Sequence, residues 1–151
     1  MSNRGYWGFG VYHPKHEVNV GTLWRSARAF GADFLFTVGR RYKAQNADTT
    51  KAWRHIPLWH FASIDDLVDH LPHSCPLIGI ELDPHADSLP SFTHPERCCY
   101  LLGAEDHGLT PDVRRACHRL VQIPSLDYCL NVASAGTVVM YDRLTKTEAV
   151  A

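Results

Sequence analysis

The chain has 151 residues, of which 45% are hydrophobic and 21% charged, a composition typical of a globular protein that argues against a disordered or fibrous chain. We expect a single domain over residues 1–151, because this length supports one hydrophobic core. The formal net charge is −1, but residues 1–54 carry +6 and residues 55–151 carry −7. This asymmetry predicts that the first third of the chain faces a polyanion.

Apolar runs, cysteines and histidines bear on the compartment and on metal binding. No run approaches the roughly 20 apolar residues of a membrane span, and the first residues lack the apolar stretch of a signal peptide. Five cysteines without C-x-x-C spacing fit neither a disulfide framework nor a zinc site, and the ten histidines are interpreted as surface residues. We therefore expect a cytoplasmic protein with reduced thiols, no metal and no membrane partner.

Short apolar runs alternate with helical patterns from one end of the chain to the other. This order predicts an α/β fold with a mainly parallel sheet flanked by helices. Strands are predicted at 7–12, 34–38, 59–61, 77–82, 98–102 and 120–123, and helices at 20–30, 64–71, 111–117 and 130–144. Because continuous apolar runs suit strands that are covered on both faces, we expect 77–82 and 98–102 to form the centre of the sheet.

Capping residues and surface patterns refine this outline. Asn19 is expected to cap the first helix and Thr110 the third. Residues 39–54 are basic and show no period, which predicts a long surface loop. The final helix, 130–144, is small and apolar nearly all round, so it is either central or packed on a partner chain.

Three segments carry residues that strands and helices do not need. In the first, Asn19–Gly31, Gly21 costs about 1 kcal/mol of helix propensity, which suggests a close backbone approach at this position. Arg25 and Arg28 lie off the apolar stripe of the same segment. Taken alone, the segment is equally compatible with a capped amphipathic helix that carries solvated arginines.

The second and third segments, Gly103–Pro111 and Gln122–Gly136, each follow a predicted strand. Ligands of open α/β sheets bind at the carboxyl ends of strands, so these loops are candidate binding loops. A glycine turn and a helix cap explain Thr110 and Pro111 but leave Glu105 and Asp106 unexplained. Backbone amides and carbonyls with little charge suit a flat polar ligand such as an adenine ring. The fingerprints of Rossmann, P-loop, hydrolase and zinc-protease sites are missing.

In this order, the three segments resemble the motifs of the SpoU/TrmH family of RNA ribose 2′-O-methyltransferases, within the SPOUT superfamily. The resemblance covers nearly the whole chain. The family pattern N-x-G-x-x-x-R-x-A is matched by Asn19, Gly21, Arg25 and Ala27, the pattern G-x-E-x-x-G-L by Gly103, Glu105, Gly108 and Leu109, and the pattern I-P with S-L-N-V by Ile123, Pro124, Leu130, Asn131 and Val132.

The resemblance implies a deep C-terminal trefoil knot that binds S-adenosyl-L-methionine. The cofactor residues that it implies are Glu81, Leu82, Leu102, Gly103, Gly108, Ile123, Pro124, Cys129 and Leu130. It also implies that Arg25 positions and activates the attacking ribose hydroxyl, with Asn19, Glu105 and Asn131 orienting it and shaping the site. An arginine is normally always protonated and is therefore a poor base, so the expected role of Arg25 is to position and electrostatically activate the hydroxyl. No metal is expected.

By the same resemblance, the basic segment binds RNA and the chain forms a homodimer. The RNA contacts are expected from Arg25, Arg28, Arg40, Arg41, Lys43, Lys51 and Arg54, which would contact phosphates without sequence specificity. Tyr42 and Trp53 are candidates for base stacking or for packing. The apolar helix 130–144 is expected at the dimer interface.

Three departures and several alternatives accompany the resemblance. Cys129 stands where the family has a serine, and the stretch after Pro124 is shorter than in many members. Asp106 stands where a glycine is common. The favoured substrate is tRNA, with ribosomal RNA as the alternative. A catalytically silent knotted RNA-binding protein and an α/β nucleotide-binding module unrelated to RNA are the rivals from other classes.

Overall fold

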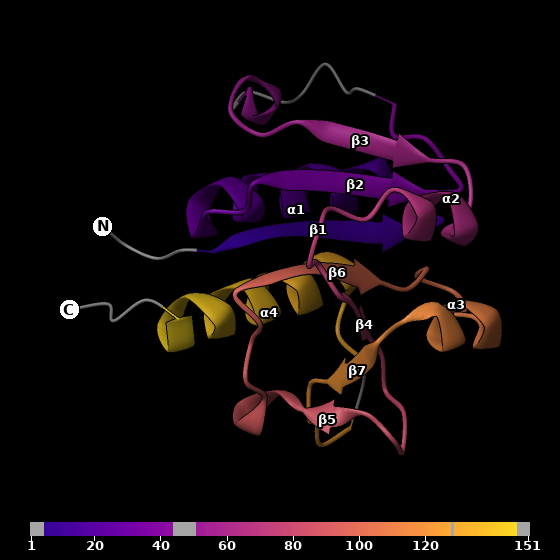
Figure 1. The fold of residues 1–151 in the computed structure, drawn as a ribbon, viewed down its shortest axis with the longest axis vertical. Coiled ribbons are helices and arrows are strands. Elements are labelled where there is room, and N and C mark those ends of the chain that lie inside the picture. Colours follow the sequence, from indigo (N-terminus) through magenta and orange to yellow (C-terminus); the bar gives the residue numbers. More distant parts are fainter. Residues whose placement is uncertain (1–4, 44–50, 128, 148–151) are drawn as a thin grey trace.

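The computed structural model describes residues 5–43, 51–127 and 129–147, which form a parallel sheet flanked by helices (Figure 1). Seven strands follow the order β3-β2-β1-β6-β4-β7-β5. Their bounds are β1 Tyr6–Tyr12, β2 Phe34–Val38, β3 Leu58–Phe61, β4 Leu77–Ile80, β5 Asp87–Ser88, β6 Arg97–Leu102 and β7 Arg119–Gln122. The helices are α1 Glu17–Phe30, α2 Ile64–Asp69, α3 Pro111–Ala116 and α4 Val132–Thr147, with 3₁₀ helices η1 Ala52–Arg54 and η2 Leu89–Ser91. All neighbouring strand pairs in this sheet are parallel, as the sequence predicts.

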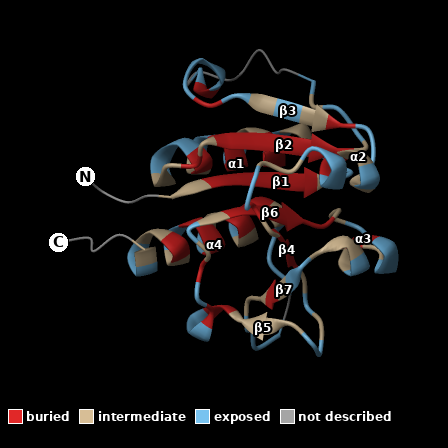
Figure 2. Ribbon diagram, viewed as in Figure 1, coloured by how far each residue is buried: buried red, intermediate tan, exposed pale blue. Residues whose placement is uncertain are grey.

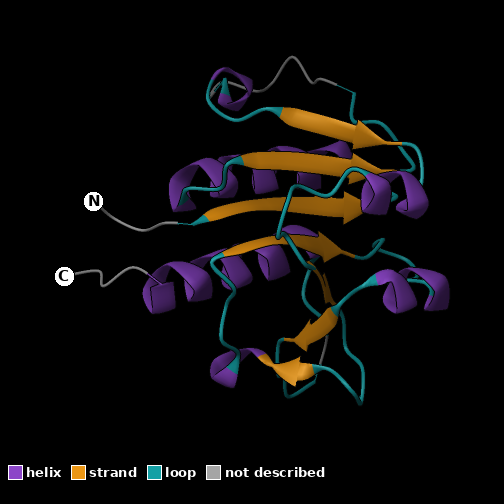
Figure 3. Ribbon diagram, in the orientation of Figure 1, coloured by secondary structure: helices purple, strands orange, loops and turns teal. Residues whose placement is uncertain are grey.

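Two hydrophobic layers cover the sheet, one on each face. Helices α1 and α4 pack on one face and α2 and α3 on the other, and the central strands β1, β2 and β6 are buried (Figures 2 and 3). Strand β1 separates the layers by alternation, with Trp7, Phe9 and Val11 in the α1/α4 layer. Gly8 and Gly10 lie between them, and a Cβ at either would overlap the ring of Phe34 or Phe36. The glycines therefore make room for the aromatic layer under α2 and α3.

The predicted elements are present, with corrected ends. Asn19 is not the cap of α1, because the helix begins at Glu17 with His16 at the N-cap, and Asn19 lies buried in its first turns. Helix α4 begins at Val132 because Asn131 is its N-cap: Asn131 Oδ1 accepts hydrogen bonds from the backbone of Ala133 (2.9 Å) and Ser134 (3.2 Å). Thr110 is the N-cap residue of α3, but its side chain makes no capping bond.

Other boundaries differ by a few residues. Strand β4 ends at Ile80 and helix α2 at Asp69, each two residues before the predicted end. The predicted loop 39–54 contains η1, which buries Ala52, and its residues 44–50 lie outside the described part. Strand β5 and η2 have no periodic signal in the sequence. No described helix is long and apolar enough to span a membrane.

The sequence predicts that the last helix is apolar nearly all round, but the inner face of α4 carries a buried arginine. Arg143 is only 1% exposed, and its Nη1 donates to the carbonyl of Pro95 (2.7 Å) and to Tyr100 Oη (3.1 Å). Its guanidinium also lies over the ring of Trp7, 5.2 Å from the centroid. A buried arginine of this kind fixes how α4 lies on β6, because its donors reach acceptors at one position only.

Candidate functional site

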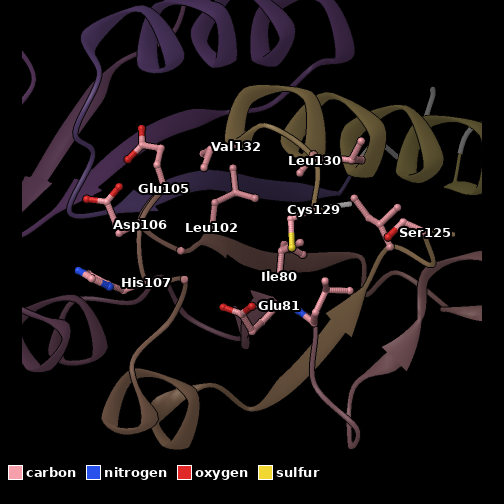
Figure 4. A pocket seen from close by; sticks show the side chains of 16 residues that line it. Ile80, Glu81, Leu102, Glu105, Asp106, His107, Ser125, Cys129, Leu130 and Val132 are labelled. Carbon is pink, nitrogen blue, oxygen red and sulfur yellow. Dashed lines mark hydrogen bonds between the residues drawn. The ribbon is translucent and has the colours of Figure 1, made fainter. Parts of the chain in front are cut away.

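A cavity of about 330 Å³ lies at the carboxyl ends of β4, β6 and β7, and we call it the β4–β6–β7 cavity (Figure 4). Its walls come from the segments that follow these strands and from the start of α4. The lining residues are Ile80, Glu81, Leu82, Leu102, Gly103, Ala104, Glu105, Asp106, His107, Gly108, Ile123, Ser125, Cys129, Leu130, Val132 and Ala135. Its position is the one where open parallel sheets bind ligands, and its size is in the range of small-molecule sites.

Two glycines shape one wall of this cavity by close backbone contact. Ala104 and Gly108 form an antiparallel bridge, with the two backbone bonds 3.2 and 2.9 Å long. A Cβ at Gly103 would lie 2.3 Å from the backbone of Gly108. Gly108 itself has a φ of +62°, and a Cβ there would lie 2.3 Å from Glu81 Oε2. Both positions therefore require glycine for steric reasons.

The carboxylate of Glu81 holds the loop against β4. Glu81 Oε2 accepts a 2.6 Å hydrogen bond from the backbone of Leu109, and Oε1 accepts one of 3.1 Å from Leu82. Leu109 is fully buried in the α2/α3 layer. Glu81 is thus a structural anchor of the second motif as well as a lining residue of the cavity.

At the rim of the cavity, Glu105, Asn19 and Asn131 form a chain of hydrogen bonds. Asn19 Nδ2 donates to Glu105 Oε1 (3.0 Å), and Asn131 Nδ2 donates to Asn19 Oδ1 (3.2 Å). Glu105 also accepts hydrogen bonds from the backbone of Lys15 (3.0 Å) and His16 (3.4 Å). One residue from each of the three sequence motifs is therefore joined in a single polar cluster.

The electrostatics of Glu105 follow from these donors. Burial by itself would raise the pKa of this carboxyl, but the hydrogen bonds from Asn19 and from the backbone of Lys15 and His16 outweigh burial and lower the pKa below its ordinary value. Glu105 is consequently ionised at neutral pH. Beside it, the Lys15 ammonium forms an exposed ion pair with Asp106 (2.7 Å) and lowers the pKa of that carboxyl.

The structure brings together most of the residues predicted for the cofactor. All of them line the β4–β6–β7 cavity except Pro124. The additional lining residues Ala104, Asp106, His107, Ser125, Val132 and Ala135 lie within the second and third segments, and Ile80 directly precedes Glu81 at the end of β4. Their closeness in sequence to the predicted residues could have identified them as candidates, but only the geometry of the loops decides which of them face the cavity.

Arg25 does not join the polar cluster within one chain. It is exposed on α1, forms no hydrogen bond or ion pair with another described residue, and is absent from the cavity lining. It lies six residues after Asn19, which is about 9 Å along the helix axis. Arg25 and Val18 are seven residues apart and share the exposed face of α1.

The remaining residues predicted to bind RNA are all exposed. Arg28 lies on α1, Arg40, Arg41 and Lys43 follow β2, and Lys51 and Arg54 flank η1. Of the two candidate stacking residues, Tyr42 packs edge-on against Trp24 with ring centroids 5.8 Å apart. Trp53 is 57% exposed, and the guanidinium of Arg54 lies 5.2 Å from its ring centroid. The aromatic surface available for stacking is thus that of Trp53. Within residues 5–43, 51–127 and 129–147, no three metal-binding side chains form a candidate metal site.

Comparison with known proteins supports the same family. The model of the "SpoU rRNA Methylase family" matches residues 9–141. No match was found among curated proteins. Among solved structures, the SpoU methyltransferase AviRb from Streptomyces viridochromogenes, in complex with AdoMet, is 26% identical over 93% of this chain, with a TM-score of 0.81. The chain spans 57% of AviRb.

Two further solved structures share the fold. An AdoMet-bound rRNA methyltransferase from Sinorhizobium meliloti has a TM-score of 0.80 at 20% identity, with 95% of this chain and 59% of that chain covered. A protein studied for the 2-OH methylation of C/U34 on tRNA has a TM-score of 0.82 at 21% identity, with 95% and 97% covered. Since the family model matches most of the sequence, including all three motifs, this chain belongs to the SpoU methylase family.

Proposed function

We propose that this protein is an S-adenosyl-L-methionine-dependent RNA 2′-O-ribose methyltransferase that acts on tRNA as a single SpoU-type domain. The observation that carries the proposal is the Glu105–Asn19–Asn131 chain, which joins three distant motif residues at the rim of a cavity. A structural role alone does not require three polar side chains from separate motifs to meet where parallel strands end.

The β4–β6–β7 cavity fits the cofactor in size and in chemistry. Ile80, Leu102 and Ile123 provide apolar walls for an adenine ring, while the neighbouring backbone offers hydrogen-bonding groups. The carboxylates of Glu105 and Asp106 lie at the same cavity and favour the cationic part of the molecule. Cys129 replaces the family serine there, and a main-chain contact at that position is unaffected by the change.

The residues of this chain act by binding and orientation. Held by the residues of the β4–β6–β7 cavity, S-adenosylmethionine would supply a methyl group already activated on a sulfonium, and the proton of the ribose hydroxyl that takes up this methyl group would pass to bulk water. Asn19 and Asn131 are held in fixed orientations by Glu105 and by the start of α4, which suits them to position the ribose. The guanidinium of Arg25 contributes positive charge to the approach of the hydroxyl.

A homodimer through α4 would complete the site with Arg25. Val138 and Tyr141 are exposed apolar residues of α4. Helix α4 lies beside α1, where Ser26 and Thr137 share a 2.8 Å hydrogen bond. An interface over both helices would cover Val18 and bring Arg25 against the partner subunit. Light scattering tests this: a Tyr141→Glu variant is expected to be monomeric, and a wild-type monomer at micromolar concentration would contradict the proposal.

The RNA surface is the exposed basic residues Arg25, Arg28, Arg40, Arg41, Lys43, Lys51 and Arg54, with Trp53 for base stacking. The preference for tRNA is supported by the tRNA-methylation structure, whose chain this one covers almost completely. The trefoil knot stays a prediction, supported by the shared fold of AdoMet-bound SpoU enzymes. A cytoplasmic location is supported by five free thiols, which suit a reducing compartment.

The test is isothermal titration with S-adenosylmethionine, followed by methyl transfer to unmodified total tRNA and to ribosomal RNA, with ribose methylation identified by nuclease digestion and mass spectrometry. We expect saturable binding and 2′-O-methylnucleoside in tRNA. Transfer to ribosomal RNA alone would correct the substrate. Binding without transfer to either RNA would favour the silent RNA-binding protein, and absence of binding would refute the proposal.

A further inference from the structure

A second cavity, of about 370 Å³, lies beside the first at the carboxyl ends of β1 and β2, and we call it the β1–β2 cavity. It is lined by Tyr12, His13, Lys15, Arg40, Ala104, Glu105, Asp106, His107, Gly108 and Thr110. Segment 104–108 lines both cavities. A molecule in the β1–β2 cavity is therefore separated from the proposed cofactor site by one short loop.

The β1–β2 cavity is lined by two cationic side chains, Arg40 and Lys15, and by two carboxylates, Glu105 and Asp106. Its two carboxylates are already engaged: Glu105 by Asn19 and two backbone N–H groups, and Asp106 by the Lys15 ammonium. Arg40 donates from Nη1 to the backbone carbonyl of Lys15 (3.2 Å) and has no carboxylate partner among the described residues. A guanidinium held at one end by a carbonyl keeps its other N–H groups available for an anion.

Further hydrogen-bonding side chains surround this cation. His13 and His107 line the cavity, as does Thr110, whose hydroxyl is not used to cap α3. Neither imidazole forms a hydrogen bond with another described residue. Arginine, imidazole and hydroxyl donors in one cavity match the acceptor oxygens of a phosphate.

His13 is held in place at a conformational cost. Its φ is +45°, a left-handed conformation that is unfavourable for a residue with a side chain. The backbone N–H of His13 bonds to the carbonyl of Val38 (2.8 Å), and its ring packs so closely on Gly39 that a Cβ there would lie 2.3 Å from Nε2. Strain of this kind is concentrated at functional sites, and here it accompanies an imidazole that packs on Gly39 and lines the same cavity as Arg40.

We propose that the β1–β2 cavity binds a phosphate group of the RNA strand next to the nucleotide that is methylated. The inference rests on the proposed function, because the methyl transfer would take place in the β4–β6–β7 cavity, on the other side of the loop 104–108. A ribose carries a phosphate on each side, so a nucleotide anchored by phosphate in this cavity can present its 2′-hydroxyl at the shared rim. The contact fixes the position of the strand and does not read its sequence.

The first test locates phosphate binding directly. Inorganic phosphate is titrated into the protein while the imidazole resonances of all histidines are followed by NMR, and a parallel titration with sodium chloride at matched ionic strength serves as the control. We expect saturable shifts of His13 and His107 with phosphate, whereas the exposed His55 and His85 should shift no more than they do with sodium chloride. Arg40→Gln should weaken this binding about tenfold, the value for losing one charged hydrogen bond. Equal shifts of all histidines, or unchanged affinity in the variant, would overturn the proposal.

The second test identifies the source of the phosphate. Arg40→Gln should raise the KM for RNA. It should also make the slope of the logarithm of the RNA binding constant against the logarithm of the salt concentration less steep by about 0.7 for single-stranded and about 0.9 for duplex RNA, which corresponds to the loss of one phosphate contact. The control Arg115→Gln removes the same charge from the exposed Asp112 pair on α3 and should leave both values unchanged. His107→Asn is a second variant, and it should raise KM as Arg40→Gln does.

The outcomes separate this inference from the proposed function. If the protein methylates RNA and neither Arg40→Gln nor His107→Asn changes KM or the salt slope, the cavity proposal is wrong and the enzyme proposal stands. If phosphate shifts His13 and His107 but no RNA is bound or methylated, the RNA assignment and the proposed function both fall. A 3′-nucleoside monophosphate that binds far more tightly than RNA would likewise overturn the assignment to an RNA strand.

Discussion

Replacing Gly108 by alanine tests how the second motif builds the proposed cofactor site. Two terms combine in this variant. A left-handed backbone costs an L-residue roughly 1–2 kcal/mol, and Gly108 has a φ of +62°. The new Cβ would lie 2.3 Å from Glu81 Oε2, so the carboxylate must leave the Leu109 amide, at a cost of about 1.5–3 kcal/mol for a charged hydrogen bond. Since Glu81 can partly relax, we expect a loss of about 3 kcal/mol.

The assay has a global and a local readout. Urea unfolding measures the total loss of stability, and hydrogen exchange of the Leu109 amide shows whether the cost is confined to the opening of this loop. Gly108 and Glu81 both line the β4–β6–β7 cavity, so the affinity for S-adenosylmethionine should fall at least about tenfold, or 1.4 kcal/mol.

Gly21→Ala is the matched control, because it is the same substitution at the glycine of the first motif. Gly21 lies inside α1, and the nearest atom to an added Cβ is Tyr42 Oη at 3.9 Å. Alanine should therefore stabilise the helix by about 1 kcal/mol without changing cofactor affinity. The reasoning is refuted if Gly108→Ala retains wild-type stability and affinity, or if Gly21→Ala is the more destabilised of the two.

Three further predictions concern charge and burial. Glu105→Gln should lower the free energy of unfolding by about 1–2 kcal/mol at pH 7 through loss of charged hydrogen bonds. Because the pKa of Glu105 is lowered in the folded state, this contribution is present above the ordinary carboxyl pKa of 4.5 and is lost as the pH falls through the folded-state pKa. Urea unfolding of the wild type and the variant should therefore converge in acid. Arg143→Met should lower the free energy of unfolding in urea by about 3 kcal/mol, because the carbonyl of Pro95 and the hydroxyl of Tyr100 lose a buried donor. The control Arg115→Gln changes an exposed residue and should stay within about 0.5 kcal/mol of wild type. Equal effects of the two variants would contradict this account of α4. At pH 8, iodoacetamide should modify the exposed Cys129 well before Cys98 and Cys117, because burial raises the pKa of these two thiols to about 11. Bound S-adenosylmethionine should slow the reaction of Cys129. Mass spectrometry of the labelled peptides gives the order of reaction, and rapid labelling of Cys98 would contradict this prediction.

The local pattern of the sequence determined the class of fold and the location of the candidate site. Alternating apolar runs and helical periods are properties of neighbouring residues, so they predicted the parallel sheet and nearly all of its strands. The motif glycines and the polar residues after β6 and β7 marked the loops at the carboxyl ends of those strands. Element ends were less well predicted, because they depend on distant groups: α1 begins before Asn19, where Glu105 accepts hydrogen bonds from the backbone of Lys15 and His16.

Tertiary structure alone decided which residues meet. The hydrogen bond between Asn19 and Glu105 joins residues 86 positions apart, and the one between Asn19 and Asn131 joins residues 112 positions apart. A sequence period of 2 or 3.6 residues cannot predict contacts over such separations. The same applies to the strand order, which puts β6 between β1 and β4, and to Arg143, whose charge predicts exposure but whose partners lie in the segment before β6 and on β6 itself. It also separated Tyr42, which packs on Trp24, from the exposed Trp53. Periodicity reports which face of an element is covered, whereas the partner across the core is set by how the chain closes over long separations.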